Sequence, residues 1–170
     1  YLDHRKFVKK IAENTIMNQQ RNQILSLSGL PDRICLIITE ASFLLDARVF
    51  MTLGIPKIAA VLENAGVNVD VLDLSGIRNY QEVVGDYVRA KGDIKYFGLT
   101  ATTPQLPTVK IIVDMIRSIN PGARTILGGP HVTLVNAAYK REKRVGIVNG
   151  RASRAMGGLE RLFDVLVAGD

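Results

Sequence analysis

Short apolar runs alternate with amphipathic helical patterns from Asp32 to the end of the chain, and this alternation limits the fold more than any other feature. The apolar runs predict five strands: Arg33–Ile38, Asn68–Leu72, Ile94–Leu99, Ala123–Leu127 and Asp164–Ala168. The first run is apolar from Ile34 to Ile38, which is typical of a strand covered on both faces. Strands separated by helices connect through right-handed crossovers, so the pattern predicts a parallel sheet.

The segments between the strands carry apolar residues at helical spacing. They predict helices over Gly54–Ala65, Tyr80–Lys91, Pro104–Ile119, Val132–Glu142 and Arg151–Phe163, while Val145–Val148 could form a short extra strand. We therefore predict an α/β protein with three αβα layers and a flavodoxin-like parallel five-stranded sheet in the order 2-1-3-4-5. In that order, a crevice opens between the first and third strands at their carboxyl ends.

Residues 1–30 differ from the rest of the chain. They are polar, rich in Asn and Gln, and they carry a helical stripe that includes Phe7 and Ile11. We expect an N-terminal helical extension over 1–30, as a lead-in, and a single Rossmann-like domain over 31–170. Because the chain begins with Tyr1 and stops just after a strand-like run, we also expect it to be a fragment of a longer protein.

The single cysteine, Cys35, excludes an internal disulfide, a multi-thiolate metal site and an iron–sulfur cluster held by this chain alone. It lies in an apolar strand pattern, so we expect a buried and unreactive thiol. These features favour a reducing, cytoplasmic location. No apolar run approaches the ~18 residues that a membrane span requires, so we expect no membrane partner.

The net charge is +6, and much of the excess lies in two basic runs. The first comprises Arg5, Lys6, Lys9 and Lys10, and the second comprises Lys140, Arg141, Lys143, Arg144, Arg151 and Arg154. Such runs are usually solvated helix faces, and docking of an acidic partner or of nucleic acid is the alternative. Aromatic residues do not interleave with these cations, which argues against nucleic acid as a partner.

Polar residues and glycines gather where the strands of the predicted sheet end. Thr100, Thr102 and Thr103 follow the third strand, and Gly128-Gly129-Pro130-His131 follows the fourth. Hydroxyls in this position can bind a base, a ribose or a phosphate, and they can equally cap the next helix. The glycines would let the backbone pass close to a bulky ligand, or would form a tight left-handed turn. The loop Thr39–Thr52 is longer than usual, which favours a functional role.

Several classes of chemistry lack their motifs in this sequence. No Gly-x-x-x-x-Gly-Lys-Ser/Thr or Gly-x-Gly-x-x-Gly motif follows the first strand, which disfavours nucleoside triphosphate and Rossmann dinucleotide sites. Glu40 alone does not make the acidic pair of a response regulator, and no Ser-His-Asp or Cys-His arrangement is evident. His131 has no other His or Cys to share a metal with. The pattern predicts a binding module with no catalytic residue and no metal site.

Five segments, in the same order, resemble the cobalamin-binding domain found at the N-terminus of cobalamin-dependent radical SAM proteins. They are Leu53-Gly54-Ile55-Pro56-Lys57-Ile58-Ala59-Ala60-Val61-Leu62; Ala65-Gly66 with Val69-Asp70-Val71-Leu72-Asp73-Leu74; Gly98-Leu99-Thr100-Ala101-Thr102-Thr103-Pro104; Asn120-Pro121 with Ile126-Leu127-Gly128-Gly129-Pro130-His131-Val132-Thr133; and Asp164-Val165-Leu166-Val167-Ala168-Gly169-Asp170. Each motif alone is loose, whereas five in this order are fairly specific. The resemblance covers about residues 32–170.

The resemblance implies that the domain holds cobalamin, with the corrin over the carboxyl ends of the strands and its dimethylbenzimidazole tail in the crevice. The third-strand hydroxyls and the Gly-Gly turn would line the tail, and the first loop with the start of its helix would approach the corrin. The implied cofactor-binding residues are Thr39, Glu40, Leu53, Gly54, Ile55, Thr100, Thr102, Thr103, Gly128, Gly129, Pro130 and His131. A radical SAM domain of the same protein, with S-adenosylmethionine and a [4Fe-4S] cluster, is implied after residue 170.

The sequence departs from two related patterns. The first loop lacks the Asp-x-His-x-x-Gly motif of methionine-synthase-type cobalamin domains, and the Cys-x-x-x-Cys-x-x-Cys motif is absent from these 170 residues. The leading hypothesis is a cobalamin-binding module for methyl transfer or radical chemistry done with the following barrel. The alternatives are a flavodoxin-like regulatory or interaction module without cobalamin, and an enzyme domain that binds a small phosphorylated ligand.

Overall fold

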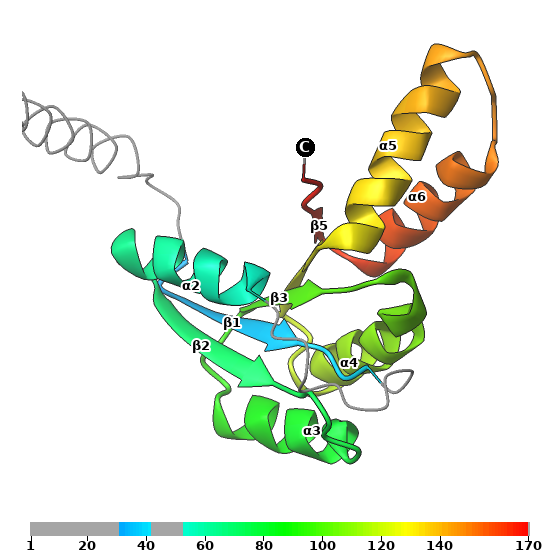
Figure 1. Cartoon of the computed structure of the whole chain (residues 1–170). Helices are drawn as coiled ribbons and strands as arrows, with labels where there is room; N and C mark the ends of the chain where they lie inside the picture. The colour runs from blue at the N-terminus through cyan, green and yellow to red at the C-terminus, as the bar shows by residue number, and fades with distance from the viewer. Residues whose placement is uncertain (1–30, 42–52, 170) are drawn as a thin grey trace, which may run out of the picture.

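Figure 1 shows the computed structural model of the chain, which describes residues 31–41 and 53–169. The predictions for residues 1–30, and for the first loop beyond Ala41, lie outside the described residues. Within them, five strands form one parallel sheet in the order β2-β1-β3-β4-β5. The strands are β1 (Arg33–Ile38), β2 (Asn68–Asp73), β3 (Tyr96–Thr100), β4 (Arg124–Gly128) and β5 (Val165–Leu166). This order confirms the predicted flavodoxin-like fold.

The helices follow the predicted segments closely. They are α2 (Gly54–Asn64), α3 (Tyr80–Ala90), α4 (Leu106–Ile119), α5 (Pro130–Arg144) and α6 (Arg151–Leu162), and a 3₁₀ turn, η1 (Thr103–Gln105), precedes α4. α5 begins at Pro130, earlier than predicted, because proline suits the first turn of a helix. The segment Val145–Val148 is a turn and not an extra strand, since Gly146 with φ +73° ends α5 and reverses the chain.

The fifth strand is shorter than predicted. It comprises two residues in place of Asp164–Ala168, and it pairs with β4. Val167 N donates a hydrogen bond to Leu127 O at 2.8 Å, so the pairing extends one bond beyond the strand. Val165 and Val167 are 47% and 52% exposed. This exposure is typical of an edge strand, which has a neighbour on one side.

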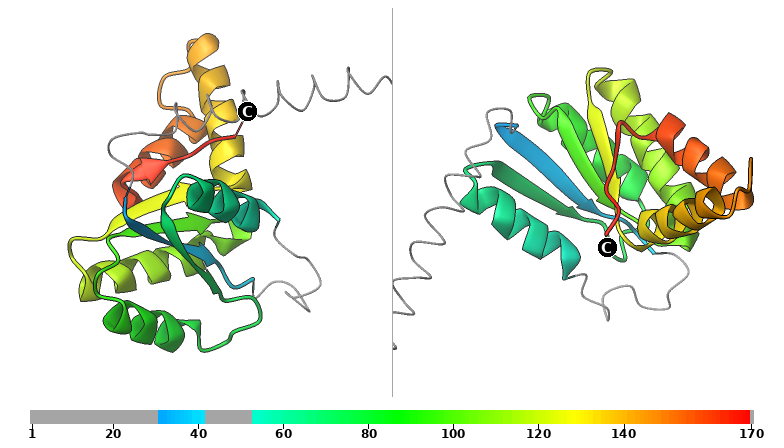
Figure 2. Two further views of the ribbon diagram at one scale, coloured as in Figure 1. Left: turned by 90° about the vertical axis from the view of Figure 1, so that its left-hand side faces the viewer. Right: turned by 90° about the horizontal axis from the view of Figure 1, so that it is seen from above.

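Helices cover both faces of the sheet and complete the three αβα layers. α3 and α4 lie on one face and α2 lies on the other, as Figures 1 and 2 show. The larger core joins α3, α4 and α6 to the sheet and includes Phe97 and Leu127. The smaller core lies under α2 and includes Leu36, Ile55 and Ala59. β1 contributes to both cores, which explains why its sequence is apolar without alternation.

The structure confirms the prediction that the Cys35 thiol is buried. The Cys35 side chain lies in the larger core, at 0% exposure. Burial raises the pKa of the Cys35 thiol to about 11, which keeps the thiol protonated near neutral pH. In the part of the chain that the structure describes, no group of three or more His, Cys, Asp or Glu side chains is placed to hold a metal ion. No helix in this part is long and apolar enough to cross a membrane.

Parallel pairing places the carboxyl ends of the strands at one edge of the sheet, which we call the carboxyl edge. In the register, Ile38 of β1 lies beside Thr100 of β3, and Thr100 lies beside Gly128 of β4. α2 and α5 follow β1 and β4, so their first N–H groups, which lack partners within the helix, lie at the same edge. The sheet therefore brings the predicted hydroxyl and glycine segments together.

Candidate functional site

Backbone hydrogen bonds tie the end of β3 to the end of β4. Ala101 N donates to Gly128 O at 3.3 Å, and His131 N donates to Ala101 O at 3.0 Å. The second bond uses one of the first N–H groups of α5 and fixes this helix against the end of β3. The segments 100–103 and 128–131 therefore lie side by side at the carboxyl edge.

The backbone conformation and the packing at position 129 require glycine, whether or not a ligand is bound. The backbone of Gly129 has φ +95° and ψ −173°, a region that is essentially restricted to glycine. A Cβ at this position would collide with Thr100 Oγ1 and lie 3.1 Å from Ala101 N. The backbone is extended and does not form the tight left-handed turn that was one interpretation of the sequence. Close packing against the end of β3 accounts for this glycine without a ligand.

Gly128 and Gly54 differ from Gly129, because a Cβ would fit at both positions. The nearest atom to a Cβ on Gly128 would be Val167 O at 3.7 Å, an ordinary van der Waals contact. A Cβ on Gly54 would meet nothing within 4 Å. Both positions therefore leave room for a Cβ-sized group, and Gly54 opens onto the surface of the described part of the chain.

The three predicted hydroxyls have different partners. Thr102 forms a capping box with Gln105, whose Oε1 accepts hydrogen bonds from Thr102 N and Thr102 Oγ1, both at 2.9 Å. Thr103 Oγ1 lies 2.9 Å from His131 Nδ1. Among the described residues, no hydrogen bond involves the Thr100 hydroxyl, although Thr100 O accepts one. Thr100 is thus the hydroxyl that remains able to bond a ligand.

Gln105 also bridges the ends of β1 and β3. Its Nε2 donates to Thr39 O at 3.1 Å and to Glu40 O at 3.4 Å. Thr39 Oγ1 donates to Thr100 O at 3.0 Å, and the side chains of Thr39 and Glu40 are almost completely buried. The side-chain amide of Gln105 therefore spans the predicted crevice between β1 and β3 at the level of Thr39 and Glu40.

Two residues that shape the site were missed from the sequence. Gln105 could have been found, because Thr102-Thr103-Pro104-Gln105 has the spacing of a capping box. Thr133 carries no such signal. Its Oγ1 donates to Gly129 O at 3.1 Å and accepts a hydrogen bond from Gly169 N at 3.0 Å, which joins the start of α5 to the chain after β5.

His131 joins η1 to α5. Its side chain is 9% exposed, and the contact with Thr103 fixes Nδ1. Burial lowers the pKa of His131, which favours a neutral ring at neutral pH. The ring also lines a cavity of about 410 Å³ between α5 and α6, together with Leu134 and Val135. His131 therefore acts at the carboxyl edge as a neutral, hydrogen-bonded group.

The remaining predicted residues lie at the starts of helices. Leu53 and Gly54 precede and open α2 and are exposed, and Pro130 opens α5 and is exposed. Ile55 is 4% exposed and packs in the core under α2. Leu53, Gly54 and Pro130 are therefore free to contact a ligand directly, whereas Ile55 acts by holding α2 in place.

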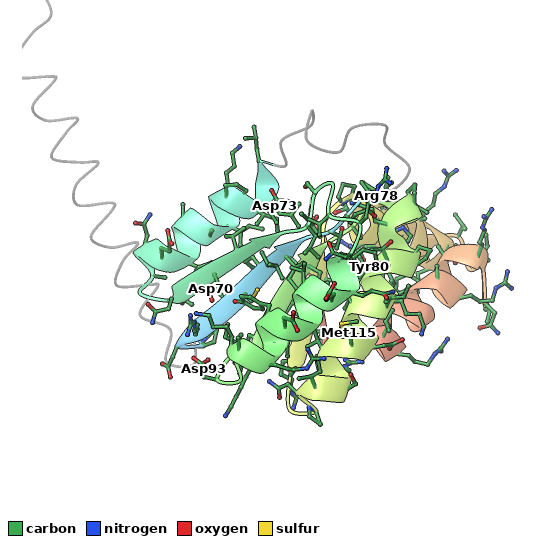
Figure 3. All side chains as sticks on the ribbon, turned by 90° about the horizontal axis from the view of Figure 1, so that it is seen from below. Asp70, Asp73, Arg78, Tyr80, Asp93 and Met115 are labelled. Carbon is green, nitrogen blue, oxygen red and sulfur yellow. The ribbon has the colours of Figure 1, made fainter. Side chains whose placement is uncertain are left out.

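A second cavity, of about 610 Å³, lies at the opposite, amino edge of the sheet, between Arg33 and the turn from α2 into β2. Arg33 is held there by Asp70 at 3.0 Å and by Asp93 at 2.9 Å, and Tyr87 OH donates to Asp70 at 2.6 Å. Figure 3 shows Asp70 and Asp93 near this edge and Asp73 further along β2. The Nη1 and Nη2 atoms of Arg33 are therefore paired, whereas Arg33 Nε is buried without a hydrogen-bond partner among the described residues. None of the predicted site residues lines this cavity, so the carboxyl edge remains the stronger candidate.

Comparison with known families identifies the class of this chain. The family model of the B12 binding domain matches residues 47–160, which is more than half of the chain. The chain therefore belongs to the B12-binding domain family, and the match includes the segments 100–103 and 128–131. This confirms the predicted cobalamin-binding family. No curated protein matches the sequence.

Two solved structures of the radical S-adenosylmethionine methyltransferase TsrM from Kitasatospora setae are similar to part of the chain. The one with tryptophan substrate and a SAM analogue is 19% identical, with a TM-score of 0.46, over 58% of this chain and 19% of TsrM. The one with cobalamin and a [4Fe-4S] cluster is 17% identical, with a TM-score of 0.48, over 69% of this chain and 23% of TsrM. The match thus spans about a fifth of TsrM, and it is too distant to support a functional conclusion.

The donors at the carboxyl edge fit the cofactor of this family. Cobalamin presents neutral amides, a ribose and a phosphate, which hydroxyls and helix N–H groups can bind. The Thr100 hydroxyl, the first N–H groups of α2, and the absence of side chains at Gly128 and Gly54 meet this description. Residues 39–52 contain no histidine, so the first loop offers no imidazole to cobalt. The fit is therefore to the organic part of the cofactor.

Proposed function

We propose that this chain holds cobalamin at the carboxyl edge and presents it to a second domain. The proposed site comprises Thr39, Glu40, Leu53, Gly54, Ile55, Thr100, Thr102, Thr103, Gly128, Gly129, Pro130 and His131. The observation that carries the proposal is the pairing of Thr100 with Gly128 on neighbouring strands of a B12-binding domain. When bound, cobalamin would supply methyl transfer or the control of a radical.

The proposed site residues divide into contact and positioning groups. Thr100, Gly128 and the starts of α2 and α5 would touch the cofactor, through a hydroxyl, open space and N–H groups. Gly129 and His131 hold these groups in place through their contacts with the end of β3 and with η1. None of the residues is proposed to be catalytic, so the chain binds, orients and restricts access to the cofactor.

Thr39 and Glu40 would contribute mainly by positioning the end of β1. They lie at the start of the first loop, and their carbonyl oxygens are held by the Gln105 amide. Their side chains are 2% and 8% exposed, so direct contact with a large ligand would be limited to an edge. We infer that this bridge keeps β1 and β3 at a fixed separation beneath the corrin.

We further propose that the second domain is a radical SAM domain of the same cytoplasmic protein, which would bind S-adenosylmethionine and a [4Fe-4S] cluster. In this proposal residues 31–170 form the cobalamin domain and residues 1–30 a helical lead-in. The support is the ordered set of five motifs, together with a first loop that lacks histidine. We expect a Cys-x-x-x-Cys-x-x-Cys motif in the coding sequence that adjoins this chain. If the full-length protein lacks that motif, the radical SAM part of the proposal is wrong, and the cobalamin-binding part is unaffected.

Cobalamin binding is tested by mixing the purified chain with hydroxocobalamin and measuring the visible absorbance that remains after desalting. We expect retention at micromolar protein. Gly128→Leu should abolish it, because the new side chain would fill the space beside Thr100, while its Cβ would fit the fold. Gly92→Leu is the matched control, since its Cβ would meet nothing within 4 Å at the amino edge.

Two outcomes would contradict the proposal. Failure of the wild-type chain to retain cobalamin would reject the function. Equal retention by Gly128→Leu and Gly92→Leu, with circular dichroism showing that both are folded, would reject this location for the site. Gly129→Leu is unsuitable for the test, because its Cβ would collide with Thr100 and disturb the fold itself.

A further inference from the structure

The hairpin formed by α5 and α6 projects away from the sheet (Figure 1) and ends in a basic tip, residues 140–154. Its cations are all exposed, and they are Lys140, Arg141, Lys143, Arg144, Arg151 and Arg154. Among the described residues none of these six forms an ion pair, although Lys143 lies over the ring of Tyr139 at 4.6 Å. The tip therefore carries an excess of positive charge, with six cations against one carboxylate, that of Glu142.

The outermost part of the hairpin tip is apolar. Val145, Ile147 and Val148 are 61%, 52% and 84% exposed, and they lie between the two groups of cations. Isolated exposed aliphatic residues are ordinary on protein surfaces, but three within four positions at the end of a projecting hairpin form a patch. The combination of an apolar end with a surrounding ring of cations indicates a surface that meets both apolar and anionic groups.

Part of the backbone of the hairpin tip is hydrogen-bonded. Gly146 N donates to Lys143 O at 3.3 Å and Ile147 N donates to Glu142 O at 3.0 Å, which is the Schellman pattern at the end of α5. The single acidic residue of the tip, Glu142, caps the start of α6 by accepting from Ala152 N and from Ser153 N, both at 2.8 Å. Among the described residues no partner is found for the N–H groups of Val148 and Asn149, so the tip suits the hydrated boundary of a bilayer and not its apolar interior.

We propose that the hairpin tip is a peripheral membrane contact that binds anionic lipid headgroups. The three aliphatic side chains would enter the boundary between headgroups and acyl chains, where interfacial segments lie about 5–10 Å deep. Lys140, Arg141, Lys143 and Arg144 lie within about 8 Å of Val145 along the axis of α5, which would place these four charges near the level of the phosphates. This contact requires no spanning segment, and it leaves the carboxyl edge of the sheet free for the cofactor.

The chemistry of the hairpin tip favours lipid over other anionic partners. Residues 140–154 contain no aromatic side chain, so the tip has nothing on which to stack a nucleic acid base. On a nucleic acid, Val145, Ile147 and Val148 would also remain in water, since phosphate contacts would engage only the cations. A bilayer surface accommodates the aliphatic and the cationic groups at the same time.

The test is co-sedimentation of the full chain with vesicles of phosphatidylcholine alone and with vesicles that contain about 30% phosphatidylglycerol. We expect binding to the anionic vesicles only, and it should weaken as salt is added. Lys143→Glu with Arg144→Glu should lower the partition coefficient on the order of tenfold or more. Lys57→Glu with Arg78→Glu makes the same change in net charge at exposed sites outside the tip, and should have a much smaller effect.

A second pair of variants tests the apolar part of the hairpin tip. Val148→Glu should lower vesicle binding, whereas Val61→Glu, at a 57% exposed position on α2, should not. Circular dichroism confirms that each variant is folded. No preference for anionic vesicles, or an equal loss in the Lys57/Arg78 control, would overturn the proposal. Binding of a duplex oligonucleotide that depends on Lys143 and Arg144, without vesicle binding, would overturn it in favour of nucleic acid.

Discussion

The two edges of the sheet are built from different chemistry. At the amino edge, Asp164 accepts hydrogen bonds from Thr125 N at 2.8 Å, from Arg124 Nη1 at 2.9 Å and from Arg117 Nη2 at 3.0 Å. Arg33 centres a second ionic cluster at the same edge. At the carboxyl ends of β3 and β4, hydroxyls, an amide and glycines take the place of ion pairs.

The contrast indicates that the amino edge stabilises the fold, whereas the carboxyl edge is suited to binding a ligand. At the amino edge each described carboxylate of these clusters already bonds a guanidinium, and breaking such a pair leaves a partly buried charge without its partner. At the carboxyl edge, the Thr100 hydroxyl and the first N–H groups of α2 have no hydrogen-bond partner among the described residues, and Gly128 presents no side chain beside Thr100. A neutral, amide-rich ligand is therefore better suited to the carboxyl edge, and the charged clusters are better suited to fixing the strands.

The largest effect is expected at Gly129, where the carboxyl edge is most tightly packed. Gly129→Ala places a Cβ against Thr100 Oγ1 at a φ of +95°, so the free energy of unfolding should fall by about 3 kcal/mol. Gly128→Ala should change it by less than about 1 kcal/mol, because the nearest atom to that Cβ is 3.7 Å away. Urea titrations of both variants measure the difference. Similar values would show that the two glycines play the same role.

The next effect is expected at the amino edge. Asp164→Asn removes the charge that Arg117 and Arg124 share, and the free energy of unfolding should fall by about 2–3 kcal/mol. Asp114→Asn is the control, since its exposed pair with Lys110 should contribute less than about 0.5 kcal/mol. Urea titrations at neutral pH compare the two. Equal losses would mean that the Asp164 cluster is no stronger than a surface pair.

The same carboxylate predicts a pH dependence. Burial by itself would raise the pKa of Asp164, but the Thr125 N–H and the guanidiniums of Arg124 and Arg117 outweigh burial and hold the pKa well below its usual range. The stability that this contributes is present above the unfolded-state pKa of about 3.9 and is lost as the pH falls through the folded-state pKa. The free energy of unfolding of the wild type should therefore fall more steeply below about pH 4 than that of Asp164→Asn. The prediction would be contradicted if the free energy of unfolding of the two proteins fell in parallel as the pH is lowered.

The order of the elements was predictable because burial leaves a direct pattern in the sequence. Both faces of β1 are covered, so Ile34–Ile38 is apolar throughout, and α4 buries Val109, Ile112 and Ile116 on one face at helical spacing. The ends of elements depend on less visible causes. β5 pairs over two residues although its apolar run is longer, and the turn at Val145–Val148 depends on the backbone conformation of Gly146.

For the site, the strand order predicted which strand ends meet but not which atoms bond. The neighbours of Thr100 and Gly128 follow from the register of parallel strands. The need for glycine at position 129 arises from Thr100, which is distant in the sequence, and no local pattern shows it. The Asp164 cluster was likewise invisible, because its partners come from α4 and β4.

A smaller effect is expected at Gln105, which joins the carboxyl ends of β1 and β3. Gln105→Leu removes the capping box with Thr102 and the bond to Thr39 O, so the free energy of unfolding should fall by about 1–2 kcal/mol. Gln81→Leu, on the exposed face of α3, is the control and should have little effect. If the two variants unfold alike in urea, the bridge adds nothing to the stability of this edge.

The smallest effect is expected at the contact between Thr103 and His131. Thr103→Val removes a single hydrogen bond, and the free energy of unfolding should fall by about 1 kcal/mol. Burial lowers the pKa of His131, so the fold favours the neutral ring, and this contribution to stability is present above about pH 6.5 and lost as the pH falls through the folded-state pKa. In a His4→Gln background, an NMR titration should give a midpoint below about 6.5 for the remaining imidazole. A midpoint at or above that value would place a titratable charge beside Thr100 and Gly128, and the carboxyl edge would then no longer be the neutral counterpart of the amino edge.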